Sequence, residues 1–179
     1  IDGIEWIRIL YCYPEEIDDT LIQAIKSEPK VCHYLDLPIQ HANDAILKRM
    51  GRRTTKQDLI DIVKKLRSEI PDICLRTTLI TGFPGETKEQ HEEVLDFIDE
   101  LEFDRLGAFT YSAEEDTPAA GFDNQIDEDV KAARRDAVME LQQEISADRS
   151  AEVVGRTLKV MIEGKLADED VYVLSLIHI

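Results

Sequence analysis

Three polar segments follow apolar runs of the chain, and each contains side chains that could bind a ligand. In the first, Gln40, His41 and Asn43 offer hydrogen-bond donors and acceptors. A plainer interpretation is that Asn43 caps the next helix and His41 is an exposed loop residue. For an isolated triplet of this kind, the residues alone favour the plainer interpretation.

The second segment is a glycine-rich turn at 81–87. Gly82 and Gly85 lack a Cβ, so they would let the backbone approach a ligand, and the next helix would present free N–H groups. Glu86 would complement the positive end of that helix. The turn lacks the Gly-Lys-Ser/Thr and G-x-G-x-x-G patterns of phosphate-binding loops. By itself it indicates a strand-to-helix connection.

The third segment, at 109–118, places the hydroxyls of Thr110 and Tyr111 before three consecutive acids, 114–116. A run of charge is usually a solvated surface. The functional alternative is an acidic rim that meets a basic substrate. No Ser-His-Asp, zinc-finger or metalloprotease pattern accompanies these segments, and the four histidines show no metal-ligand spacing.

The elements that could position these segments alternate between strand and helix patterns. Apolar, β-like runs predict strands at 7–12, 33–39, 74–81 and 106–111. Helices are predicted to begin near Pro14, Asn43, Thr55 and Thr87. Strands that alternate with helices form parallel sheets, whose reactive residues lie at the carboxyl ends of the strands. The sequence therefore predicts an α/β fold in which each polar segment follows a strand.

The last third of the chain follows a different pattern. A polar loop at 112–127 precedes a long helix with an apolar side. After Gly155 the residues alternate strictly, with Leu158, Val160 and Ile162 facing one way. We therefore predict three regions: an α/β part at 1–125, a connecting helix at 126–151, and the start of a separate small β domain at 152–179.

Composition limits the classes of partner and compartment. The 179 residues carry a net charge of −17, which disfavours nonspecific nucleic-acid binding and favours a basic partner, although a plain acidic surface is the simpler interpretation. No apolar run is long enough to span a membrane and no signal peptide opens the sequence, so a cytoplasmic location is expected. Cys12, Cys32 and Cys74 form no C-x-x-C pair or disulfide framework; Cys12 and Cys74 are expected to be buried and inert.

Both ends of the sequence are expected to be cuts, because the chain opens inside an apolar run and stops on the apolar residues 171–179. Those last residues have the character of foreign or frame-shifted sequence. The alternative is a genuine final strand.

Three motifs in the same order and spacing give the chain a family resemblance. They are Tyr34–His41, Thr78–Thr87 and Phe103–Ser112. Over about residues 6–164 the chain resembles the radical S-adenosylmethionine methylthiotransferases. Within that family, Gln40-His41 and the stretch 104–107 are similar to the branch that modifies an aspartate of a ribosomal protein, whereas the transfer-RNA branch typically has Gln-Ser at this position.

The resemblance implies a fold and a reaction. The fold would be the C-terminal part of an open (β/α) radical-SAM partial barrel, then a helix and the start of a TRAM domain, a small β-barrel. The full-length enzyme would use S-adenosylmethionine and two 4Fe-4S clusters to convert C–H to C–SCH3 at the β-carbon of an aspartate, through a 5′-deoxyadenosyl radical. The cluster ligands are absent from this chain, and the three cysteines fit neither cluster motif.

The resemblance also implies roles for individual residues, although it assigns no catalytic residue. Gln40 and Arg76 would point at S-adenosylmethionine, and its adenine side would be wrapped by Gly82, Phe83, Gly85 and Glu86. His41 and Tyr111 would line the substrate channel. For Arg76 the alternative is an ion pair with an acid on a neighbouring strand.

The implied partners are a basic small-subunit ribosomal protein and an electron donor. Two other functions remain open: a transfer-RNA methylthiotransferase, and a chain that is inactive when isolated because it holds no cluster.

Overall fold

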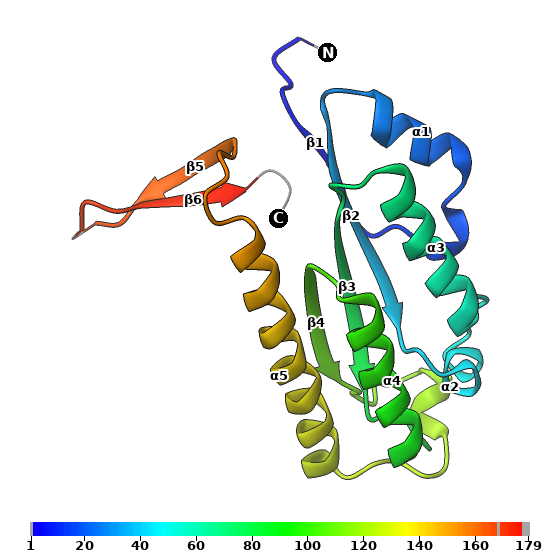
Figure 1. Ribbon diagram of the computed structural model, residues 1–179. Coiled ribbons are helices and arrows are strands. Elements are labelled where there is room, and N and C mark those ends of the chain that lie inside the picture. Colours follow the sequence, from blue (N-terminus) through cyan, green and yellow to red (C-terminus); the bar gives the residue numbers. More distant parts are fainter. Residues whose placement is uncertain (1, 168, 177–179) are drawn as a thin grey trace.

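A parallel sheet of four strands forms the centre of the computed structural model, which describes residues 2–167 and 169–176 (Figure 1). Its strands lie in the order β1-β2-β3-β4, and each neighbouring pair is parallel. The bounds are β1 Ile7–Ile9, β2 Val31–Gln40, β3 Cys74–Thr81 and β4 Arg105–Thr110. The predicted α/β class with a parallel sheet is confirmed.

Five helices accompany this sheet in the described residues. They are α1 Asp19–Ser27, α2 Asp44–Arg49, α3 Lys56–Glu69, α4 Lys88–Leu101 and α5 Glu128–Glu152. The prediction that a helix begins at Pro14 is wrong. Residues Pro14–Glu16 form a short 3-10 helix, η1. Helix α1 begins after Asp18, whose side chain accepts a hydrogen bond from the amide of Leu21. A carboxylate cap satisfies an N–H that the first turn cannot bond internally.

The predicted caps near the polar segments are confirmed. Asn43 accepts the amides of Ala45 and Ile46 at the start of α2. Thr55 forms a capping box at the start of α3, and Thr87 forms one with Gln90 at the start of α4. These contacts fix where each helix starts relative to the strand that precedes it.

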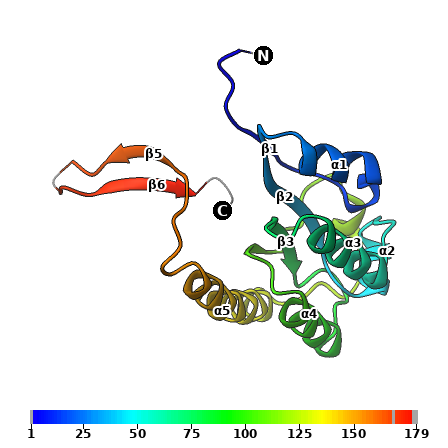
Figure 2. The same ribbon diagram turned by 45° about the horizontal axis from the view of Figure 1, so that its top comes forward.

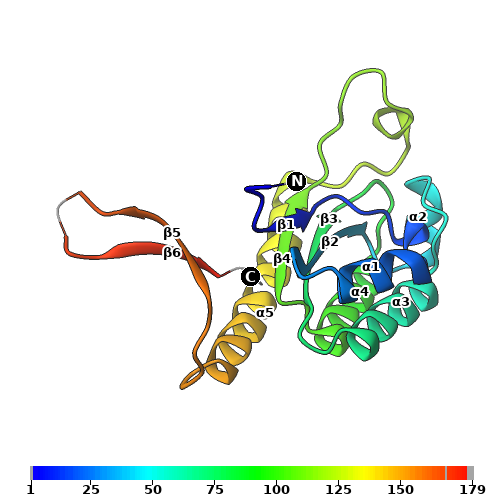
Figure 3. The same ribbon diagram turned by 90° about the horizontal axis from the view of Figure 1, so that it is seen from above.

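The helices cover one face of the sheet (Figure 3). Leu35 and Leu37 of β2 and Leu75 and Leu79 of β3 belong to the main core with residues of the helices. Successive side chains of a strand point to opposite faces. The intervening residues, among them Tyr34, Asp36, Cys74 and Arg76, therefore belong to the other face, which we call the inner face.

The first strand is shorter than predicted. Its ladder with β2 is limited to Ile7–Ile9, although the amide of Cys12 still donates to the Asp36 carbonyl at 2.9 Å, and Tyr11 adopts a left-handed backbone with φ 56°. Leu10 is 51% and Tyr11 75% exposed. An apolar run of six residues thus yields three residues of strand, because only one neighbouring strand is available to it among the described residues.

A separate hairpin follows α5. Its strands, β5 Val160–Lys165 and β6 Tyr172–Leu176, are antiparallel and lie apart from the parallel sheet (Figures 1 and 2). On the predicted apolar face, Ile162 is 64% exposed, whereas Leu158 and Val160 are half-buried. The division into three regions and the start of a TRAM domain stay predictions. Of the tail expected to be foreign, residues 177–179 lie outside the described residues. Among the described helices, none combines the length and apolarity needed to cross a membrane.

Candidate functional site

The carboxyl ends of β2, β3 and β4 lie side by side and carry the predicted polar segments. Gln40 ends β2 in a left-handed conformation with φ 73°, where the pairing of β2 with β3 is irregular. Gly82 and Gly85 follow β3 with φ 72° and 76°. The amide of Tyr111, directly after β4, donates to the carbonyl of Thr81. The strand ends are therefore tied to one another by backbone contacts.

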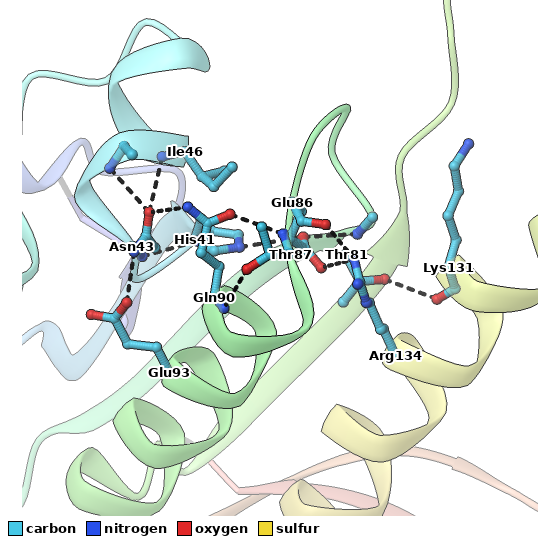
Figure 4. Close-up of polar contacts among 12 residues, drawn as sticks. His41, Asn43, Ile46, Thr81, Glu86, Thr87, Gln90, Glu93, Lys131 and Arg134 are labelled. Atoms are coloured by element: carbon cyan, nitrogen blue, oxygen red, sulfur yellow. Dashed lines mark hydrogen bonds and ion pairs between the residues drawn. The ribbon is translucent and has the colours of Figure 1, made fainter. Parts of the chain in front are cut away.

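A buried carboxylate joins two of these strand ends. One oxygen of Glu86, Oε2, accepts the amide of Gly82 at 2.9 Å and lies 3.3 Å from Nε2 of His41 (Figure 4). The Nδ1 of His41 accepts the amide of Asn43 at 2.9 Å, so the ring proton lies on Nε2 and is donated to Glu86. The side chains of His41 and Glu86 are each 1% exposed. The carboxylate thus links the loops after β2 and β3.

Helix α5 supplies two buried cations that the sequence patterns did not indicate. Arg134 donates from Nη1 to Oε1 of Glu86 at 2.8 Å and to the Glu86 carbonyl at 3.1 Å. Lys131, one turn earlier, donates from Nζ to the carbonyl of Tyr111 at 3.1 Å and to Glu128 at 2.7 Å. No sequence pattern indicates either residue, because a cation on an amphipathic helix normally faces solvent.

The glycines of the turn are required by neighbouring protein groups. A Cβ at Gly82 would overlap Cγ of Lys131, and a Cβ at Gly85 would overlap the Arg49 guanidinium. Both glycines also adopt positive φ, which strains other residues. From the sequence we expect the missing Cβ atoms to leave room for a ligand. In the structure, side-chain atoms of Lys131 and Arg49 occupy that space.

An aromatic cluster packs beside the same turn. Phe83 meets Tyr111 edge to face at 5.3 Å between ring centroids, and Phe122 at 6.1 Å. The guanidinium of Arg49 lies over the rings of Phe83 and Phe122. Tyr111 is 8% exposed, and its buried hydroxyl has no hydrogen-bond partner among the described residues.

Arg76 lies away from this turn, near the beginning of β3. Its Nη1 donates to Oδ2 of Asp36 at 2.9 Å, across the β2–β3 pair in which the two residues are in register. The alternative of an ion pair with a neighbouring strand is therefore what the structure shows. The Asp36 side chain is 1% and that of Arg76 36% exposed. Six residues separate Arg76 from Gly82, which is roughly 20 Å along a strand.

Burial and charge shift the pKa of several groups near the turn. Burial alone would raise the pKa of Glu86, but the hydrogen bond and charge of His41, the charge of Arg134 and the Gly82 amide together lower it. Burial lowers the pKa of His91, which lies on α4 near Glu86, His41 and Arg134. Glu86 is therefore held as a carboxylate and His91 as a neutral imidazole.

The cysteines do not form a reactive or metal-binding group. Burial raises the pKa of Cys74 to about 12, so its thiol is inert, as predicted. Cys32 is also buried, whereas Cys12 is only half-buried. Among the described residues, no three His, Cys, Asp or Glu side chains gather as a metal site would require.

A cavity of about 380 Å³ lies at the opposite end of the sheet from the polar turn. It is lined by Cys74 and Arg105, near the starts of β3 and β4, and by Arg149 and Val153 at the end of α5. None of the predicted site residues lines it.

Comparison with known proteins identifies the family of this chain. Residues 2–98 match the model of the Radical SAM superfamily, and the chain belongs to that superfamily. It is 62% identical over 173 residues to "Ribosomal protein uS12 methylthiotransferase RimO" of Lachnoclostridium phytofermentans, a match that covers 97% of this chain and 39% of the relative. The protein of the same name from Desulfitobacterium hafniense is 54% identical over 94% of this chain and 38% of its own length.

A solved structure supports the fold independently. The radical SAM enzyme coproporphyrinogen III oxidase (HemN) of Escherichia coli aligns with a TM-score of 0.65 and 22% identity, over 78% of this chain and 32% of that one. The radical-SAM fold expected from the motifs is confirmed. The chain spans about two fifths of the length of the curated relatives it matches.

The structure brings together some of the predicted site residues and separates others. His41, Gly82 and Glu86 meet through hydrogen bonds, and Phe83 packs on Tyr111. Arg76 stands apart with Asp36. Contacts of these residues with S-adenosylmethionine or a substrate stay predictions, but the buried side chains of His41 and Glu86 are occupied by protein partners.

Proposed function

We propose that this chain is part of a methylthiotransferase that uses S-adenosylmethionine to convert C–H to C–SCH3 at the β-carbon of an aspartate in ribosomal protein uS12. The observation that carries the proposal is the 62% identity over 97% of the chain to a relative named for this activity. Membership of the Radical SAM superfamily supports the cofactor class. A cytoplasmic location is part of the proposal, because the proposed substrate is a ribosomal protein.

Arg76 fits the proposed binding of the cofactor's carboxylate. Its Nη1 is used by Asp36, and its other N–H groups have no hydrogen-bond partner in the part of the chain that the structure describes. A guanidinium carries five donors and binds carboxylates well. The side chain is 36% exposed, so these donors are accessible from the inner face. Asp36 would hold the guanidinium in place.

The turn at the end of β3 fits the proposed adenine side of the site. The turn is held by protein contacts: Glu86 accepts the Gly82 amide, Lys131 packs against Gly82, and the Gly85 amide donates to the Asn124 carbonyl at 2.8 Å. A backbone fixed in this way loses little freedom when a ligand binds. Gln40 lies at the neighbouring strand end, where its half-buried amide would supply hydrogen bonds.

The described residues do not fit an iron–sulfur cluster, since no suitable group of ligands gathers among them. In the proposed full-length enzyme, two 4Fe-4S clusters held by other residues would supply the electron and the sulfur for the reaction. Residues of this chain would orient the cofactor and substrate and exclude water. We propose that the isolated chain forms no 5′-deoxyadenosine; product from this chain alone after cluster reconstitution would contradict that.

The proposed partners are a basic ribosomal protein and an electron donor. The net charge of −17 favours a basic partner through long-range attraction. The acids Glu114, Glu115 and Asp116 are exposed on the loop that follows β4, at the same end of the sheet as the proposed site. These acids would form a rim of the proposed site and contact the basic substrate there.

The proposal is tested by giving the full-length, cluster-loaded protein both candidate substrates. We expect mass spectrometry to show one methylthio group on an aspartate of uS12, and none on transfer RNA in a parallel reaction. A reaction without S-adenosylmethionine is the control. Methylthiolated transfer RNA with unmodified uS12 would overturn the proposal in favour of the transfer-RNA branch.

A further inference from the structure

Helix α5 holds the loop after β3 through buried contacts of Arg134 and Lys131, two residues that lie outside the sequence motifs. Arg134 is the central residue, because its Nη1 bonds both the side chain and the carbonyl of Glu86. Its side chain is only 13% exposed. Figure 4 shows Arg134 and Lys131 approaching the turn from α5 while His41 approaches it from the other side.

Every oxygen of the Glu86 carboxylate is occupied in this arrangement. Oε1 accepts from Arg134, and Oε2 accepts from the amide of Gly82 and from His41. A buried carboxylate needs such donors, since an unpaired charge away from water is costly. Three donors of the protein thus engage the Glu86 carboxylate, which acts as the junction of β2, β3 and α5.

Lys131 completes the contact of α5 with the strand ends. Its Nζ bonds the carbonyl of Tyr111, its own carbonyl accepts the hydroxyl of Thr81 at 3.3 Å, and its Cγ fills the space beside Gly82. The side chain is 5% exposed. The ends of β3 and β4 are thus fixed against one turn of the same helix.

We propose that Arg134, supported by Lys131, is a positioning residue for the binding of S-adenosylmethionine: it acts through Glu86 to hold the Gly82–Gly85 backbone in its binding conformation. This inference rests on the proposed function, because it takes that backbone as the adenine side of the site. Arg134 itself touches no ligand. Loss of its contacts lets the loop adopt other conformations, and the cofactor must then select the competent one.

The test uses the full-length, cluster-loaded protein and the Arg134→Gln variant. We expect the dissociation constant and the KM for S-adenosylmethionine to rise about tenfold, while kcat at saturating cofactor changes by less than about twofold. Hydrogen exchange of the Gly82 amide, which donates to Glu86, should become faster. The matched control is Arg135→Gln, one residue along α5, because Arg135 pairs with its exposed neighbour Asp136 and should leave all three values unchanged.

The Arg134→Lys variant is a second test, which can still be made if the Arg134→Gln variant does not fold. Lysine keeps the charge beside Glu86 but cannot reproduce the guanidinium geometry, so we expect a rise in the dissociation constant of about threefold. Wild-type affinity in the folded lysine variant, or in the folded glutamine variant, would overturn the positioning role. A wild-type protein that does not bind S-adenosylmethionine would instead refute the proposed function, which separates the two failures.

Discussion

Two buried carboxylate–arginine pairs stand on the same sheet, but their surroundings differ. Glu86 and Arg134 have side chains that are 1% and 13% exposed, and both carboxylate oxygens are bonded. Asp36 is equally buried, yet its Oδ1 has no hydrogen-bond partner among the described residues, and its partner Arg76 is 36% exposed. The same chemistry therefore occurs in two forms: the closed pair fixes a loop, and the half-open pair leaves guanidinium donors exposed, which we propose bind the cofactor.

The largest expected effect comes from neutralising the closed pair. Glu86→Gln leaves Arg134 buried without its counter-charge, which should lower the free energy of unfolding by about 3–5 kcal/mol. Urea unfolding measures the loss. Glu92→Gln on α4, the helix that follows this turn, is the control, because Glu92 pairs with the exposed Lys88 and the substitution should change stability by less than about 0.5 kcal/mol. Equal effects of the two substitutions would show that Glu86 does not carry the junction.

A smaller loss of stability is expected from a substitution that prevents α5 from packing closely on the turn. Gly82→Ala places a Cβ against Lys131 and forces alanine to a φ of 72°, so the free energy of unfolding should fall by about 2–3 kcal/mol. Thermal unfolding checks this. In Gly107→Ala the nearest contact is an ordinary 3.7 Å to the Phe109 ring, and stability should stay within about 0.5 kcal/mol. A neutral Gly82→Ala would mean that α5 is not packed on this glycine.

Double-mutant cycles compare the two pairs directly. The coupling of Asp36→Asn with Arg76→Gln should be about 1 kcal/mol, because a third of the Arg76 side chain is exposed to solvent and screened. The coupling of Glu86→Gln with Arg134→Gln should be at least about twice as large, since both side chains are largely buried. A larger coupling for the Asp36–Arg76 pair would reverse the assignment of the closed and half-open pairs.

The buried groups His91 and Glu86 also predict how the free energy of unfolding depends on pH. The folded pKa of His91 lies below its usual 6.5, so the unfolded chain binds more protons and stability falls as pH drops from about 6.5. The folded pKa of Glu86 lies below 4.5, so a second loss begins as pH falls below about 4.5. Urea unfolding at a series of pH values measures both. His91→Gln should remove the upper step. Glu86→Gln should reduce the lower one without abolishing it, because the pKa values of Glu89 and Glu93 are also lowered; unchanged profiles would contradict this.

Local signals in the sequence were sufficient to predict much of the fold. The bounds predicted for the third strand are those of β3, Cys74–Thr81, because its β-branched run is flanked by Pro71 and Gly82. The capping box of Thr87 could also be predicted, because its partner Gln90 lies only three residues away in the sequence. Where the contact is local, spacing is enough.

The candidate site depended on contacts between distant residues, and sequence reasoning missed these. His41 bonds Glu86, 45 residues away, so the interpretation of His41 as an exposed loop residue is wrong. Arg134 reaches Glu86 across 48 residues. The choice between a ligand and an ion pair for Arg76 could not be made until the β2–β3 register placed Asp36 opposite it. Register is set by the packing of both strands, which a single strand does not reveal.

Titration of S-adenosylmethionine into the full-length, cluster-loaded protein tests most directly whether the half-open pair binds the ligand. The variant is Arg76→Gln, and its urea midpoint is measured in parallel. We predict a dissociation constant about tenfold or more above that of the wild type. The urea midpoint should also fall, because the substitution leaves the buried Asp36 carboxylate without its counter-charge, and the titration is made where the variant is still folded. Wild-type affinity in the folded variant would contradict the assignment of Arg76 to the cofactor and leave its ion pair with Asp36 as a purely structural contact.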